Sequence, residues 1–198
     1  MRTIESYLPI FTGFYGSYFD SDIAEENTIY NLVECEGLDI TCDDVDFDYQ
    51  DYQNRVAMAC VDSIENYLKH DGFSIAIEFE KVYSPREYNF SNDVIYCTYK
   101  VSDEDFMRLL NYTKANLSEF KGFLIEKYSS SPGFISFFST ESKIWLNEYL
   151  NEDSDKFTRA FAGLLEFYLA NEGYSADDML DDCTEETSYI DHEILTTS

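Results

Sequence analysis

Apolar and polar residues follow two different periods in the middle of the chain. Residues 50–70 carry an apolar stripe at helical spacing, and Asp71 and Gly72 then supply a stop signal, so this segment is predicted to be a helix. Residues 73–83 and 94–101 alternate apolar and polar side chains, which is typical of strands. Residues 84–93 between them contain proline and asparagines suited to a turn. The two strands are therefore predicted to pair as an antiparallel hairpin.

The flanking regions divide into a strand-rich beginning and a helix-rich end. Aromatic residues and two glycines in residues 8–20 favour a strand or hairpin, and residues 28–36 favour another short strand. Further helices are predicted for residues 103–115, 118–128, 140–150 and 154–172, followed by a short acidic helix over residues 176–186. Ser102 and Ser175 are suited to cap helix starts, and Gly173 to end one. The order predicts one α+β domain over residues 1–198, with an antiparallel sheet in the N-terminal half, a mostly helical C-terminal half and a soft division near 101–102.

Charge changes this picture of an ordinary domain. The chain of 198 residues has 40 Asp and Glu against 13 Lys and Arg, a formal net charge of −27. No Lys or Arg occurs between Arg2 and Arg55, nor after Arg159. Nucleic acid and anionic membranes are poor partners for such a chain, because both require clustered cations. Repulsion among so many negative charges opposes folding, and solubility requires far fewer of them. The excess of negative charge therefore indicates a functional role, such as contact with a basic protein.

Two acidic segments are the candidate partner-binding residues. On a helix, Asp177, Asp181 and Glu185 form one acidic row. Asp178, Asp182 and Glu186 form a second row next to it. Four helical residues rise about 6 Å, so two rows approach the phosphate spacing of about 3.4 Å along a DNA strand. An ordinary solvated acidic face explains the C-terminal rows equally well when they are taken alone. The complete candidate set is Asp39, Asp43, Asp44, Asp46, Asp48, Asp51, Asp177, Asp178, Asp181, Asp182, Glu185 and Glu186.

The chain contains partial matches to several catalytic and metal-binding motifs, but each of them lacks residues that the motif requires. The acidic run from Asp44 resembles the start of a calcium-binding EF-hand loop, but Tyr49 replaces the required glycine and Arg55 the required glutamate. The five cysteines lack C-x-x-C spacing, and the two histidines form no catalytic set with a nucleophile. Glu119 and Lys121 match a nuclease E-x-K fragment, but on a predicted helix rather than a strand. The expectation is no catalytic residue, no metal and no cofactor, with reduced thiols in a cytoplasmic protein.

Two resemblances bear on function. Residues 83–93 look like a stretch found in uncharacterised phage and mobile-element proteins. At the level of charge, the whole chain is similar to DNA-mimic inhibitors of the antirestriction and anti-CRISPR type. That similarity implies an anti-defence protein acting in the host cytoplasm if the gene is carried by a phage. This similarity is one of composition alone, so no functional role of a particular residue can be inferred from it.

The sequence therefore favours a DNA-mimicking inhibitor that occupies the basic nucleic-acid-binding surface of a host defence protein. An immunity protein that neutralises a basic toxin would share these electrostatics. A carboxylate- or metal-dependent enzyme is a further alternative, because forty acids always include close pairs. Halophilic adaptation fits less well, since the chain is rich in Ile, Phe and Tyr. A monomer and a homodimer are both compatible with the sequence.

Overall fold

The computed structural model describes residues 1–9, 48–83, 94–127, 155–175 and 178–179. These residues form a three-stranded antiparallel sheet and helices, which confirms the α+β class. The elements in chain order are β1 (Arg2–Tyr7), α3 (Tyr49–His70), β2 (Ile75–Tyr83), β3 (Val94–Val101), α5 (Asp103–Ala115), α6 (Leu117–Lys127) and α9 (Asp155–Asn171).

The sheet has the strand order β1-β3-β2. Strand β3 is antiparallel to both neighbours, so β1 and β2 run parallel to each other with β3 between them. Helix α3 connects β1 to β2, which gives the split βαβ arrangement. The predicted hairpin is confirmed as β2 and β3, with a register shift between Phe79 and Lys81 that marks a β-bulge.

The two faces of the sheet differ in burial. Ile4, Ile77, Cys97 and Tyr99 lie on the face covered by helices and are buried. The opposite face, here called the open sheet face, carries side chains that are exposed or half-buried. It includes Glu5, Tyr7, Glu78, Glu80, Tyr96 and Lys100. A half-buried antiparallel sheet produces this alternation, since successive side chains point to opposite faces.

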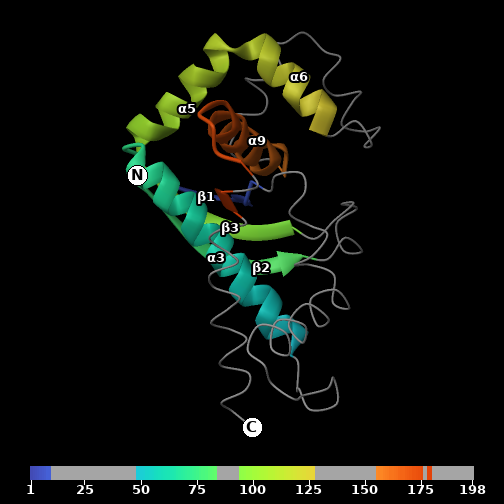
Figure 1. Ribbon diagram of the computed structural model, residues 1–198. Helices are drawn as coiled ribbons and strands as arrows, with labels where there is room; N and C mark the ends of the chain where they lie inside the picture. Colours follow the sequence, from blue (N-terminus) through green and yellow to red (C-terminus); the bar gives the residue numbers. More distant parts are fainter. Residues whose placement is uncertain (10–47, 84–93, 128–154, 176–177, 180–198) are drawn as a thin grey trace.

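Helix α3 begins and ends where its sequence predicts. Asp48 caps the N-terminus, and Gly72, with φ of 85°, follows the C-cap residue Asp71. The left-handed conformation of Gly72 is one that other residues adopt only with strain. Val56, Cys60 and Ile64, spaced four residues apart along one side of the helix, are fully buried. Helix α3 packs against β2, as seen in Figure 1.

The helices of the C-terminal half complete the core. Figure 1 shows α9 between the sheet and the pair α5 and α6. The ring of Phe161 in α9 lies 5.0 Å from that of Tyr99 in β3 and 6.3 Å from that of Phe106 in α5. One cluster of buried residues therefore contains side chains from both sides of the 101–102 boundary. Gly173, with φ of 97°, follows α9 as expected.

Strand β1 lies earlier than any strand predicted from the sequence. The sequence places a strand or hairpin over residues 8–20, whereas the observed strand ends at Tyr7. Predictions for residues 10–20, 28–36 and 140–150 lie outside the described residues. Of the cysteines, Cys60 and Cys97 are buried and not in disulfides, and burial, with Glu80 nearby, raises the pKa of Cys97 to about 12. Within the described ranges, no helix is long and apolar enough to cross a bilayer.

Candidate protein-interaction surface

Asp48 and Asp51 are the two members of the first acidic segment that the structure describes. Asp48 is exposed, and its Oδ1 accepts hydrogen bonds from the backbone N–H groups of Gln50 at 3.0 Å and Asp51 at 3.1 Å. Asp51 is also exposed and forms an ion pair with Arg55 at 2.8 Å. Asp48 thus satisfies otherwise unpaired donors at the helix start, and Arg55 offsets the charge of Asp51.

Asp178 is the described member of the second acidic segment. Its Oδ2 accepts hydrogen bonds from the backbone N–H of Ser175 at 2.7 Å and from the Ser175 hydroxyl at 2.6 Å. The side-chain bond, followed by the backbone bond, lowers the pKa of Asp178 below its usual value. The backbone N–H of Asp178 donates in return to the Ser175 hydroxyl at 3.4 Å, which completes the reciprocal pairing of a capping box, with Ser175 in the capping position that the sequence predicts. The exposed carboxylate of Asp178 therefore stays ionised near neutral pH.

The other nine candidates lie outside the described residues: Asp39, Asp43, Asp44, Asp46, Asp177, Asp181, Asp182, Glu185 and Glu186.

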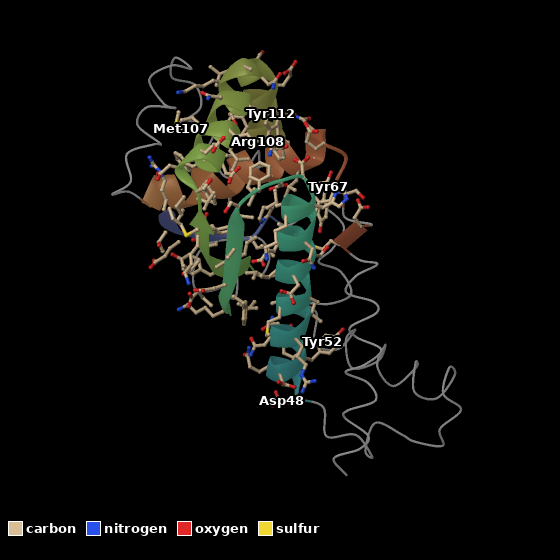
Figure 2. All side chains as sticks on the ribbon, turned by 90° about the vertical axis from the view of Figure 1, so that its left-hand side faces the viewer. Asp48, Tyr52, Tyr67, Met107, Arg108 and Tyr112 are labelled. Carbon is tan, nitrogen blue, oxygen red and sulfur yellow. The ribbon has the colours of Figure 1, made fainter. Side chains whose placement is uncertain are left out.

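The structure places the described candidates at opposite ends of α3. Asp48 and Asp51 lie at its start, whereas Asp178 is close enough to Tyr67, in its last turn, to raise the pKa of that phenol. Figure 2 shows Asp48 and Tyr67 at the two ends of the helix. A helix of 22 residues is about 33 Å long. The two segments are thus not brought together into one patch at these positions.

Around Asp178 the structure reveals a surface that the sequence did not indicate. It is called here the tyrosine–carboxylate surface, and it combines two phenols and four carboxylates from helices α3, α5 and α6 and from the residues that follow α3 and α9. Its members are Tyr67, Asp71, Tyr112, Glu119, Glu172 and Asp178. The residues come from segments that are distant in sequence, so no local pattern could have revealed it.

The electrostatics of this surface are set by negative charge around phenols. Burial, and then the charges of Asp71, Glu172 and Asp178, raise the pKa of Tyr67. The Tyr67 hydroxyl donates to the backbone carbonyl of Glu172 at 3.0 Å. Burial is likewise the largest cause of the raised pKa of Tyr112, and Glu172 and Glu119 add to it. Both phenols therefore remain neutral hydrogen-bond donors beside carboxylates, an arrangement suited to a cationic partner.

Arg108 of α5 holds this region together. Its guanidinium donates to the Asp71 carboxylate at 3.0 Å, to the Asp71 carbonyl at 3.1 Å and to the Tyr168 hydroxyl at 2.7 Å. It also lies 4.1 Å from the ring centre of Phe73, within cation–π range. The Tyr168 hydroxyl donates in turn to Asp71, and burial followed by this bond raises the pKa of Tyr168 well above its usual value. Figure 2 shows Arg108 and Tyr112 together on α5.

The described ranges include some of the residues that other functions would use. They contain no group of three or more His, Cys, Asp or Glu side chains that could hold a metal ion. Glu119 and Lys121 lie on helix α6, as the sequence predicts, rather than on a nuclease-type strand. His70 is the last residue of α3, in the position expected for a favourable interaction with the helix dipole.

The described residues hold 17 of the 40 carboxylates and 11 of the 13 Lys and Arg side chains, which gives them a formal charge of −6. The contacts described above therefore involve fewer than half of the carboxylates of the chain.

Comparison with known proteins adds no relative, because no family model, no curated protein and no solved structure matched the chain.

Proposed function

We propose that this protein is a DNA-mimicking inhibitor that occupies the basic nucleic-acid-binding surface of a host defence protein. The observation that carries the proposal is the net charge of −27, together with the absence of Lys and Arg between Arg2 and Arg55 and after Arg159. A net charge with a magnitude of about 2–8 is enough to keep a small domain soluble. The excess works against the compact state through self-repulsion, so it supports a use in binding.

The proposed mechanism is occupancy. Carboxylates take the positions of phosphates against an Arg- and Lys-lined groove, and long-range attraction speeds the encounter. Helix α3, about 33 Å long, separates Asp48 at its start from Asp178 beside its last turn, a span of roughly ten phosphates along one DNA strand. Tyr67 and Tyr112 supply aromatic contact area beside the charge, which helps to fix one binding register. No catalytic residue and no cofactor take part.

The experiment begins with capture of partners from a bacterial lysate by the immobilised protein. Bound proteins are eluted with a 30-base-pair DNA duplex in one arm and with a salt gradient in another. A captured partner is then purified, and its affinity for the protein is measured from low to high salt. We expect elution by the duplex and a steep loss of affinity with salt, because screening weakens exposed charge contacts.

Charge reversal then assigns the contact. Reversing three or four acids to lysine within residues 43–51 or 177–186 should weaken binding far more than reversing the same number elsewhere. Exposed controls of the same charge type are Asp62 on α3 and Glu104 on α5. A flat salt response, or equal losses from target and control sets, would contradict mimicry. A captured toxin, in place of a defence protein, would assign the same electrostatics to an immunity function.

A further inference from the structure

The connector that follows α9, residues 172–175, is held by backbone hydrogen bonds to the last turn of that helix. The N–H of Tyr174 donates to the carbonyl of Leu169 at 2.9 Å, and the N–H of Gly173 donates to the carbonyl of Ala170 at 3.4 Å. These two bonds, with Gly173 in the left-handed conformation at φ of 97°, make a Schellman motif. Tyr174 therefore leaves the helix in one defined direction.

That direction brings the buried side chain of Tyr174 against α3. Its hydroxyl shares a buried hydrogen bond of 2.8 Å with the hydroxyl of Ser63. Its ring centre lies 4.9 Å from that of Tyr67, at an edge-to-face angle of 64°. The Tyr67 hydroxyl in turn donates to the backbone carbonyl of Glu172. Because Ser63 and Tyr67 are four residues apart, they lie on one side of α3 and together attach the connector to its C-terminal part.

The next helical turn begins directly from this connector. Ser175 and Asp178 form the capping box described above, and the N–H of Met179 donates to the carbonyl of Ser175 at 3.4 Å. Met179 is fully buried, whereas Asp178 is exposed. Figure 2 shows the short ribbon of residues 178–179 next to Tyr67 at the end of α3. Asp178 is thus held between a cap and a buried side chain, so its position is tied to that of the connector.

We propose that Tyr174 is a positioning residue for binding of the partner. Its contacts fix the place beside α3 at which the second acidic segment, residues 177–186, begins. The partner then meets Asp48 and Asp178 at a set separation. The inference rests on the proposed function for the nature of the partner, a basic protein, and adds a geometric requirement to the requirement for charge. A group that is already held in its bound position loses less conformational freedom on binding, which improves affinity without any new contact.

The test loosens the connector without changing the charge. Ser63 and Tyr174 are 4% and 3% exposed, so neither side chain is available to a partner. Tyr174→Phe and Ser63→Ala each leave one buried hydroxyl without the other. Each should raise the dissociation rate of the captured partner about threefold, measured by surface plasmon resonance, because the acidic segment must be ordered again on binding. The association rate and its salt dependence should be unchanged, since every carboxylate is retained.

Two further readouts separate positioning from a general loss of stability. Amide hydrogen exchange at Met179 should be faster in both single variants, because its hydrogen bond lies in the turn that the connector holds. The double variant Ser63→Ala/Tyr174→Phe removes both hydroxyls, so no buried hydroxyl is left unpaired by the change. Its dissociation rate should not exceed that of the single variants, whereas independent effects would multiply to about ninefold.

Tyr99→Phe is the matched control, because it also removes an inner tyrosine hydroxyl, which donates to the Tyr7 carbonyl at 2.9 Å within the sheet. It should lower the free energy of unfolding but leave the dissociation rate of the partner unchanged. Equal dissociation rates in Tyr99→Phe and Tyr174→Phe, wild-type rates in both connector variants, or unchanged exchange at Met179 would each overturn the proposal. Such results could coexist with binding that is salt-dependent and displaced by DNA. Wild-type binding that responds to neither salt nor DNA would instead contradict the proposed function.

Discussion

The carboxylate of Glu65 in α3 accepts a hydrogen bond from the backbone N–H of Ile77 in β2. Strand β2 is at the edge of the sheet, where unpaired N–H groups would form a template for another strand. The α3 side chain therefore satisfies an edge donor, and the bulge next to it makes that edge irregular. The contact joins the helix and the hairpin that were each predicted from local patterns.

Replacing Glu65 should reveal the value of this contact. Glu65→Ala leaves the Ile77 donor without its acceptor, so the free energy of unfolding should fall by about 1–3 kcal/mol. Glu65→Gln keeps an amide oxygen as acceptor and should cost less. Lys69→Ala removes only the ion pair to Glu65, for which about 0.3–0.5 kcal/mol is expected. Urea unfolding measures all three, and similar losses for Glu65→Ala and Lys69→Ala would show that the edge contact contributes little.

Arg108 and Tyr168 should behave as a coupled pair. Tyr168→Phe removes the hydroxyl that accepts from Arg108 and donates to Asp71, and a loss of about 1–3 kcal/mol is expected from these two hydrogen bonds. Arg108→Lys should also destabilise the fold, because an ammonium cannot reproduce the forked contacts and the stacking on Phe73. A double-mutant cycle should give a coupling of about 0.5–2 kcal/mol. Strict additivity in that cycle would contradict a shared network.

The pH dependence of one ion pair can be tested directly. The hydrogen bond from Arg2 is the largest cause that lowers the pKa of Asp103 below its usual 3.8. A lowered folded-state pKa means that this contribution is present above about 3.8 and is lost as the pH falls through the lower value. The gap in unfolding free energy between wild type and Asp103→Asn should therefore be larger at pH 6 than at pH 2. A gap that is the same at both pH values would show that the asparagine acts through some other change.

The acidic segments should tolerate single changes but not grouped ones. Exposed charge contacts contribute about 0–1 kcal/mol each, so neutralising one candidate, such as Asp178, should change partner affinity little. Neutralising four together should lower both the affinity and its salt dependence, because fewer contacts are screened. Isothermal titration of the captured partner at two salt concentrations measures both quantities. A single neutralisation that abolishes binding would indicate a specific site instead of a distributed surface.

Local patterns predicted much of the fold. The helix predicted over residues 50–70 is observed as Tyr49–His70, and the one predicted over 103–115 has those same limits. These segments combine a clear period with caps, and both signals are local. Strand β1 was not predicted because Ile4 is the single large apolar side chain on its buried face, where Ser6 is its buried neighbour. Its place in the sheet depends on pairing with β3, which no local pattern encodes.

The candidate surface was less predictable than the fold. Asp178 and its cap at Ser175 follow from a short motif, and both are observed. The contacts of Arg108 with Asp71 and Tyr168 join residues 37 and 60 positions apart. Such contacts depend on how the helices pack, and helix packing is a property of the assembled core. The same holds for the open sheet face, where Glu5 and Glu78 lie in one row only once the three strands are in register.

The position of β1 also has a consequence for folding during synthesis. Its Tyr7 meets Tyr99 of β3, 92 residues later in the chain, whereas β2 and β3 are neighbours in sequence. At about 5–20 residues per second, the ribosome needs roughly 5–20 s to deliver the later strand. Strands β2 and β3 can pair soon after both have left the ribosome. Strand β1 is synthesised much earlier, and its backbone groups cannot pair with β3 until β3 has been made. Docking of β1 is therefore a late, high-contact-order step, and it should limit the folding rate.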